Sequence, residues 1–286
     1  PSGYEPDELP YCSTPRREEW TYRYIYNPCQ IIYSLRAMCA RDLVSLVIPV
    51  FNERENLDHL FGEIQAVCTA MPYDWEVLFV DDGSDDGSLE VIKRLHQAHC
   101  EVRYVSFAAN CGQSAAFMAG FQRARGTTVI TLDADLQNDP QDIPHLLQTL
   151  DSHGLDMVIG WRAERQDSWI KLVASRIANR IRNALSRETV RDTGCSLKVM
   201  RTHLAKRLPL FDGMHRFMPT LLKLEGARVG EIQVNHRPRR FGVSKYGIWD
   251  RAWRGLRDLL AVRWMQDRHV RYSVKDESEK DHALDE

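Results

Sequence analysis

The apolar run Leu43-Val44-Ser45-Leu46-Val47-Ile48-Pro49-Val50 opens a regular alternation of strand-like and helix-like segments. Further strands are predicted at 75–80, 102–107, 127–132 and 156–161, and helices near 56–70, 87–98, 112–124 and after Pro140. Such alternation is typical of right-handed βαβ crossovers. The predicted fold class is therefore α/β, with a doubly wound, mainly parallel sheet that binds ligands at the carboxyl ends of its strands.

The remainder of the 286-residue chain is organised around this core. Residues 1–42, rich in Tyr and interrupted by Pro, are predicted to be an N-terminal extension, and 43–246 the main domain. A basic amphipathic helix is expected at 247–271 and a polar tail at 272–286. A chain of this length can bury a core without disulfides or metals to stabilise it.

The cysteines and the hydropathy of the sequence bear on its compartment. The seven cysteines include no CxxC pair, which argues against a disulfide framework and a zinc site and favours a reducing, cytoplasmic location. The longest uncharged stretch, 104–122, is too polar to predict a transmembrane helix, and the acidic N-terminus does not resemble a secretory signal. Membrane contact is therefore expected to be peripheral.

The small net charge of −2 hides a division along the chain. Residues 1–159 carry 11 Lys and Arg against 24 Asp and Glu, whereas residues 160–271 carry 25 against 10. This division suggests a metal-binding half and a half that binds phosphate or anionic lipid, although two solvated surfaces of opposite sign would give the same count.

Two carboxylates close one of the apolar strands, in the sequence Thr131-Leu132-Asp133-Ala134-Asp135-Leu136-Gln137. If the extended geometry continued, Asp133, Asp135 and Gln137 would project from one face. Such oxygen ligands suit Mg²⁺ or Mn²⁺, which also take phosphate oxygens as ligands. Taken alone, an Asp-rich turn or helix cap is the more common origin of this pattern.

A second acidic cluster, from Asp81 to Asp86, lies between another strand and a helix. It begins like an EF-hand loop, but Lys93 stands where the bidentate Glu is required. Its carboxylates would instead accept hydrogen bonds from a nucleotide, or Ser84 or Asp86 would simply cap the helix. The sequence contains no GxGxxG, Walker A, HExxH or Ser-centred nucleophile elbow, which disfavours dehydrogenases, P-loop proteins and hydrolases.

Four motifs in order resemble family 2 glycosyltransferases, in particular the branch that transfers sugars to dolichyl or polyprenyl phosphate, as dolichol-phosphate mannosyltransferases do. They are VIPVFNE at 47–53 with Asn56-Leu57, VDDGS at 80–84, NCG at 110–112 with Ala116 and Gly120, and DADLQ at 133–137 with Pro140. The resemblance covers residues 43–265. It implies a GT-A fold, a UDP- or GDP-sugar donor and a divalent metal, Mg²⁺ or Mn²⁺.

The resemblance also implies roles for residues of the acidic half. Pro49, Phe51, Glu53, Asp81, Asp82 and Asp133 would bind the nucleotide sugar, and Asp133, Asp135 and Gln137 the metal. Each has a structural alternative, since Pro49 can end a strand and Phe51 can be core. Ala116 and Gly120 are expected to allow close helix packing.

In the Arg-rich half, the resemblance implies that Arg162 and Arg176 bind the acceptor phosphate. Guanidinium groups suit this task because their donors pair bidentately with phosphate oxygens. Arg240, Ser244 and Lys245 belong to the segment RPRRFGVSKY, which is similar to a mobile loop of the family and is interpreted as a lid over the phosphates. Asp192 is expected to orient acceptor or sugar, with a structural loop role as the alternative, and Asp135, Arg162 and Asp192 are the catalytic candidates.

Two basic segments with helical spacing, 168–187 and 247–266, carry Trp and could lie in a lipid headgroup region. Packing of their apolar stripes on the protein's own core is an equal alternative.

The predicted reaction is an inverting transfer of a sugar to polyprenyl phosphate at a membrane surface, by a protein that is not expected to bind nucleic acid and is compatible with a homo-oligomer. The phosphate acceptor is already ionised, so no strong general base is needed. Transfer to a glycan or protein hydroxyl is the alternative, for which Asp192 would have to serve as base. A non-catalytic nucleotide-binding protein ranks lower, as does a processive synthase, because Leu260 stands where its QxxRW signature needs Gln.

Overall fold

The structure is a computed structural model that describes residues 42–162, 190–238 and 248–270. All of these belong to one unit of the chain, from Arg41 to Glu286. Residues 1–41 and the predicted phosphate-binding residues Arg176, Arg240, Ser244 and Lys245 lie outside the described residues, as does the helix predicted at 168–187.

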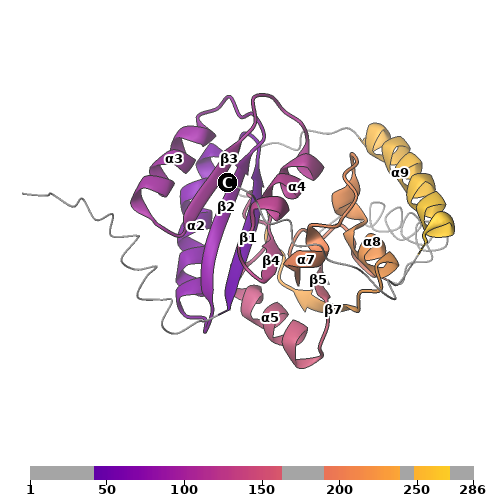
Figure 1. Cartoon of the computed structure of the whole chain (residues 1–286). Helices are drawn as coiled ribbons and strands as arrows, with labels where there is room; N and C mark the ends of the chain where they lie inside the picture. Colours follow the sequence, from indigo (N-terminus) through magenta and orange to yellow (C-terminus); the bar gives the residue numbers. More distant parts are fainter. Residues whose placement is uncertain (1–41, 163–189, 239–247, 271–286) are drawn as a thin grey trace, which may run out of the picture. The chain divides into compact units, whose positions relative to one another are not determined.

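The described residues form one seven-stranded sheet with the order β3-β2-β1-β4-β6-β5-β7 (Figure 1). The strands are β1 (Leu43–Val50), β2 (Asp74–Asp81), β3 (Val102–Ser106), β4 (Thr128–Thr131), β5 (Met157–Arg162), β6 (Lys198–Arg201) and β7 (Val229–Val234). Neighbours are parallel except where β6 pairs with β4 and β5. The prediction of a mainly parallel α/β sheet is confirmed.

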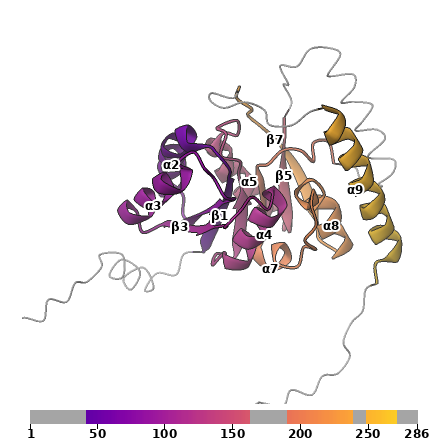
Figure 2. The same ribbon diagram turned by 90° about the horizontal axis from the view of Figure 1, so that it is seen from above.

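Helices cover both faces of the sheet, as Figure 2 shows for α2 and α3 on one side and α4 and α7 on the other. The helices are α2 (Arg54–Thr69), α3 (Ser88–Ala98), α4 (Gln113–Arg123), α5 (Ile143–Ser152), α7 (Thr202–Ala205), α8 (Met218–Leu224) and α9 (Ile248–Arg268), with short turns η1 (Pro140–Asp142) and η2 (Met214–Arg216). Because both faces are covered, the central strands are buried on both sides and mostly apolar rather than alternating.

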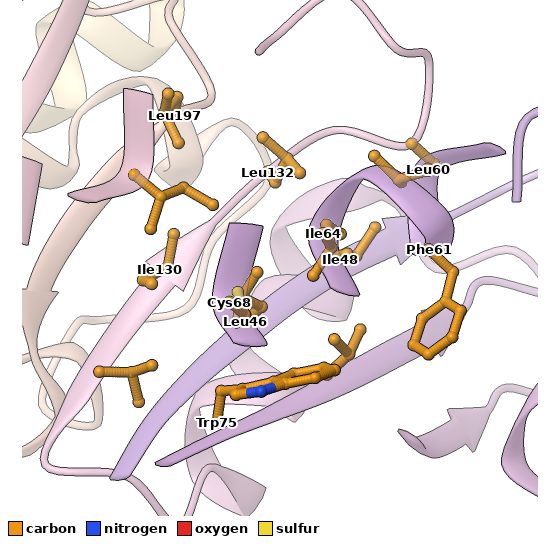
Figure 3. Close-up of a cluster of buried hydrophobic side chains, with 14 of the residues drawn as sticks. Leu46, Ile48, Leu60, Phe61, Ile64, Cys68, Trp75, Ile130, Leu132 and Leu197 are labelled. Atoms are coloured by element: carbon orange, nitrogen blue, oxygen red, sulfur yellow. The ribbon is translucent and has the colours of Figure 1, made fainter. Parts of the chain in front are cut away.

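Two hydrophobic clusters form the core, one on each face. Leu46 and Ile48 of β1 point toward α2, where they meet Leu60 and Ile64 (Figure 3). The neighbouring Val47 points to the other face and packs with α4. This division follows from the two-residue side-chain period of a strand.

Helix α4 approaches the sheet unusually closely at Gly120. A Cβ atom at this position would stand 2.2 Å from Cγ1 of Val47, closer than any real side chain permits. Ala116, one turn earlier, is also fully buried. The predicted role of these small residues in helix packing is confirmed.

Strand β6 was not predicted, and it shapes the site. It runs against β4 and β5, so its first residue, Lys198, pairs with Thr131 at the end of β4 and with Ile159 in the middle of β5. The reversed strand β6 therefore starts where β4 finishes. Residues that precede β6 consequently join the loops at the carboxyl ends of the parallel strands.

Candidate active site

The loops after β1 and β2 are bound to one another at the carboxyl edge. The amide N–H of Asn52 donates to Ser84 Oγ (3.0 Å), and the Asn52 side chain donates to Asp85 (2.7 Å). Asp86 accepts hydrogen bonds from the N–H groups of Arg54 and Ser88, the first residues of α2 and α3. One carboxylate thus serves two helix N-termini, where negative charge is favourable. Although burial opposes it, this hydrogen bonding lowers the pKa of Asp86.

The predicted nucleotide-binding carboxylates Asp81 and Asp82 hold these loops together. Asp82, 3% exposed, accepts from the N–H groups of Cys111 (2.6 Å) and Gly112 (2.9 Å) and from the Asn110 side chain (3.0 Å). Burial raises the pKa of Asp82 although these hydrogen bonds oppose the shift. Asp81 accepts from Ser84 N–H and Ser106 Oγ. Both carboxylates are engaged by the protein itself.

The other predicted donor-binding residues adjoin the same loops. Pro49 pairs with Val80 within the sheet, and Phe51 and Glu53 follow the end of β1. The Glu53 side chain accepts a hydrogen bond from Asn56 Nδ2 (2.6 Å). All three are partly exposed.

Asp133 and Asp135 lie in a turn rather than on a continued strand. Strand β4 ends at Thr131, and Leu136 has a φ of 61°, a left-handed conformation that costs a non-glycine residue energy. The alternation expected for Asp133, Asp135 and Gln137 therefore does not hold. Gln137 takes part through its backbone, donating to Asp135 Oδ1 and accepting from Arg237 N–H.

The two carboxylates nevertheless affect one another. Burial first, and then the negative charge of Asp135, raise the pKa of Asp133 to about 6. Gln113, the first residue of α4, donates from Nε2 to Asp133 Oδ1 (2.7 Å). A sheltered pair of repelling carboxylates fits a hard divalent cation. Within the described residues no three His, Cys, Asp or Glu side chains gather, so such a cation would need further oxygen ligands from amide, water or substrate.

Arg162 and Asp192 form a bidentate ion pair at the end of β5. Arg162 Nε donates to Asp192 Oδ2 (2.7 Å) and an Nη donates to Oδ1 (3.1 Å), while Gly194 N–H donates to the same carboxylate (3.2 Å). Burial opposes the charge, yet the hydrogen bonds and charge of Asp192 raise the pKa of Arg162. The sequence predicted both residues, and the structure brings them together.

A cavity of about 350 Å³ opens beside Asp133 and the loop that follows Asp192. Asp133, Thr193, Gly194 and Ser196 line one part of it, and its other walls include Lys198, Asp212, Gly213, His215, Arg216 and Asp258. Lys198 was not predicted. It is only 4% exposed, its ammonium group donates to the Cys195 carbonyl oxygen, and burial lowers its pKa although Asp133 and Asp192 oppose the shift.

His215 also escaped prediction, because its partner is distant in sequence. Its Nδ1 lies 2.9 Å from Oγ of Ser114 on α4, and that oxygen accepts from Gly213 N–H. Burial, aided by the charges of Arg216 and Lys198, lowers the pKa of His215 to about 3. The imidazole is therefore neutral and offers hydrogen bonds rather than charge. The sequence offers one local signal for His215: it stands with Arg216 between the apolar residues Met214 and Phe217.

The beginning of the predicted lid segment is joined to the acidic turn. Asn138 and His236 form an isolated bridge, and Arg237 makes ion pairs with Asp139 and Glu63, both at 2.7 Å. Residues 239–247, which contain the rest of that segment, lie outside the described part of the chain.

Helix α9 contributes Leu259 and Val262 to the hydrophobic cluster that also contains residues of α4 and α8. Leu260 and Trp264 face outward, 54% and 64% exposed, with Arg257 and Arg268 also exposed. Among the described residues, no helix combines the length and apolar character needed to cross a bilayer.

Solved glycosyltransferases share this fold. A mannosyltransferase from Pyrobaculum calidifontis, solved with GDP-Man and Mn²⁺, has a TM-score of 0.56 and 19% identity, over 86% of this chain and 74% of that one. Glucosyl-3-phosphoglycerate synthase from Mycobacterium tuberculosis, solved with Mn²⁺, uridine diphosphate and phosphoglyceric acid, has a TM-score of 0.60 and 17% identity, over 85% and 84%. The fold and its acidic edge thus define a GT-A glycosyltransferase.

The sequence pattern of glycosyl transferase family 2 matches residues 45–208, so the chain belongs to glycosyltransferase family 2. A dodecaprenyl-phosphate galacturonate synthase from Rhizobium johnstonii is 39% identical over 236 residues, 81% of this chain and 68% of that protein. An undecaprenyl-phosphate 4-deoxy-4-formamido-L-arabinose transferase from Aeromonas hydrophila is 39% identical over 207 residues, 72% and 63% respectively. The chain thus spans about two thirds of these relatives. The predicted resemblance to the family is confirmed.

Proposed function

We propose that the protein transfers a sugar from a nucleoside-diphosphate sugar to polyprenyl phosphate, with inversion at the anomeric carbon. Family 2 membership and two relatives with polyprenyl-phosphate names support the reaction class. The observation that carries the choice of acceptor is the bidentate pairing of Asp192 with Arg162.

A hydroxyl acceptor would need a general base, whereas a phosphate acceptor would not. Both oxygens of Asp192 accept hydrogen bonds from Arg162, and Gly194 adds a third donor. A carboxylate so engaged is a weak base, because proton uptake would cost it these charge-assisted bonds. Asp192 instead orients Arg162, which supports a phosphate acceptor over a glycan or protein hydroxyl.

On the donor side, the partly exposed Pro49, Phe51 and Glu53 contact the nucleotide, while Asp81 and Asp82 shape the loops beneath it. Asp133 and Asp135 would hold Mg²⁺ or Mn²⁺, with Gln137 as a further ligand. A divalent cation held there supplies positive charge to the departing diphosphate. The neighbour solved with GDP-Man and Mn²⁺ supports both the donor class and the metal.

In the reaction, an acceptor phosphate oxygen forms a bond to the anomeric carbon as the bond from that carbon to the nucleoside diphosphate breaks. The nucleoside diphosphate leaves with the electron pair. The acceptor phosphate is bound by Arg162. Four residues outside the described part of the chain complete its binding site: Arg176, Arg240, Ser244 and Lys245. Because attack comes from the face opposite the leaving group, the configuration inverts.

A membrane surface is the expected place of reaction, since the acceptor is a lipid. The outward Leu260 and Trp264 on α9, next to Arg257 and Arg268, support such contact because apolar and cationic groups together suit a headgroup region. The alternative was that the apolar side chains of this helix all pack on the protein's own core. The exposure of Leu260 and Trp264 does not support that alternative for these two side chains.

The test combines the full chain, Mn²⁺, polyprenyl phosphate and a panel of UDP- and GDP-linked sugars that includes UDP-galacturonate, with glycolipid detected by mass spectrometry. One sugar should appear on the lipid phosphate. Asp133→Asn and Asp135→Asn should each lower turnover by at least about 100-fold, because each removes charge that holds the metal. Chelation of the metal should abolish turnover.

Asp58→Asn is the matched control, because Asp58 is an exposed aspartate on α2 that pairs with Arg94 outside the site. Its turnover should equal that of the wild type. Sugar transfer only to hydroxyl acceptors, or metal-dependent nucleotide binding without transfer across the panel, would contradict the proposal.

A further inference from the structure

Lys198 stands out among the charged groups of the cavity because, among the described residues, no carboxylate forms a direct ion pair with it, although the charges of Asp133 and Asp192 act on it. Its side chain is 4% exposed and lines the cavity. In the described part of the chain its ammonium has one hydrogen-bond acceptor, the Cys195 carbonyl oxygen, and no carboxylate within ion-pair distance. An ammonium has three N–H donors, so its hydrogen-bonding capacity is left largely unused.

A buried cation of this kind is costly to the fold. Taking an ammonium out of water costs several kcal/mol unless a counter-charge and hydrogen bonds compensate. Arg162, whose side chain is 18% exposed, has such compensation from its ion pair with Asp192. Within the described residues Lys198 has no direct ion pair of this kind, so an anion that enters the cavity would supply a direct partner.

The position of Lys198 on β6 explains how it reaches the cavity. Because β6 is antiparallel to β4, Lys198 lies at the edge where β4 ends, and it lines the cavity with Asp133 and residues of the loop 193–196. A lysine at the other end of the same strand would lie far from this edge.

We infer that Lys198 binds a phosphoryl oxygen of the acceptor phosphate, in the cavity that it lines together with Asp133 and Gly194. This assignment rests on the proposed function. A divalent cation at Asp133 and Asp135 would balance the donor diphosphate, and Asp192 already neutralises Arg162. The acceptor phosphate, which carries close to two negative charges near neutral pH, would gain from a further cation beside the arginines, and among the described residues that line the cavity Lys198 is a buried one.

The experiment compares Lys198→Met, which keeps an unbranched side chain of similar length and removes the charge, with Lys198→Arg, which keeps the charge. Lys206→Met is the matched control, since Lys206 donates to the Ala124 carbonyl and does not line the cavity. Lys198→Met should raise the KM for polyprenyl phosphate by about 10- to 100-fold, the effect of one charge-assisted hydrogen bond. Lys198→Arg should recover part of this loss, and Lys206→Met should match the wild type.

The Kd for UDP or GDP with Mn²⁺, measured by titration calorimetry, should stay within twofold in Lys198→Met. A weakened nucleotide Kd with an unchanged KM for the lipid would assign Lys198 to the donor and overturn the inference. Unchanged values of both would overturn it too.

Two measurements need no turnover. Lys198→Met should unfold at the same temperature as the wild type or higher, because a thioether is easier to bury than an ammonium. A clearly lower midpoint would make Lys198 a structural residue and overturn the inference.

Inorganic phosphate should raise the unfolding temperature of the wild type more than that of Lys198→Met, and an equal shift in the two proteins would count against the inference. If the wild type and Lys206→Met bind nucleotide but transfer no sugar, the proposed function itself fails, and the phosphate measurement still reports on Lys198.

Discussion

Aspartates of similar appearance in the sequence have different tasks in the structure. Asp82 is surrounded by N–H donors from residues 110–112, whereas Asp133 faces a second carboxylate. Both follow strands, and both were predicted to bind the donor. Sequence motifs identified the acidic edge. They could not show that backbone N–H groups bind Asp82, because these donors come from a loop about thirty residues further along the chain.

Asp82→Asn should destabilise the protein by about 1–3 kcal/mol, because an amide NH₂ would face the N–H groups of Cys111 or Gly112 and leave a buried donor unpaired. The free energy of unfolding is measured by urea denaturation at neutral pH.

Asp85→Asn is the control, since Asp85 is exposed and retains its hydrogen-bonding to Asn52 through an amide oxygen. We expect a change within about 0.5 kcal/mol. Equal effects of the two substitutions would mean that Asp82 does not hold the loops together.

At the level of elements, periodicity predicted β1 to β5 and the intervening helices to within a few residues. It missed β6, because a four-residue strand that begins with a buried lysine and ends with arginine has no apolar run. It missed β7, whose residues are mostly half-buried and include Gly230 and Glu231. Consequently Lys198 and His215, which depend on β6 and on a contact between α4 and η2, were also missed.

Gly120→Ala should destabilise the protein by about 1–3 kcal/mol, since the new methyl group overlaps Val47 and α4 must move away from the sheet. The higher helix propensity of alanine, worth up to about 1 kcal/mol, would offset only part of this. Urea denaturation measures the difference.

Gly62→Ala on α2 separates the two contributions. Nothing lies within 4 Å of a Cβ at Gly62, so propensity acts alone and we expect stabilisation by about 0.5–1 kcal/mol. A stabilised Gly120→Ala variant would show that α4 can shift without loss.

For the molecule as a whole, the division of charge along the sequence corresponds to a division of work in the proposed reaction. The acidic part supplies the loops after β1, β2 and β4, and the basic part supplies Arg162, Lys198 and α9. Charge counts indicated this division but could not distinguish cations used for lipid from those used for phosphate, since that depends on burial.

Replacement of Leu260 and Trp264 together by Gln should weaken binding to vesicles of phosphatidylglycerol and phosphatidylcholine by about 10-fold or more. Both side chains are exposed and would bury apolar area in the headgroup region. Co-sedimentation measures the effect. High salt should also weaken the binding of the wild type, because it screens the charges of Arg257 and Arg268.

Leu210→Gln is the control, because Leu210 is a leucine of similar exposure (57%) outside α9. Its vesicle binding should be that of the wild type. Undiminished binding of the α9 double variant would contradict a role for this helix at the membrane.

The hydrogen bonds among the loops after β1, β2 and β3 have a thermodynamic consequence for donor binding. Asn52, Asp82 and Asp86 fix these loops during folding, so little conformational entropy remains to be lost when a nucleotide arrives. Such preorganisation lets a modest number of nucleotide contacts produce useful affinity, at the expense of adaptability toward nucleotides of other shapes.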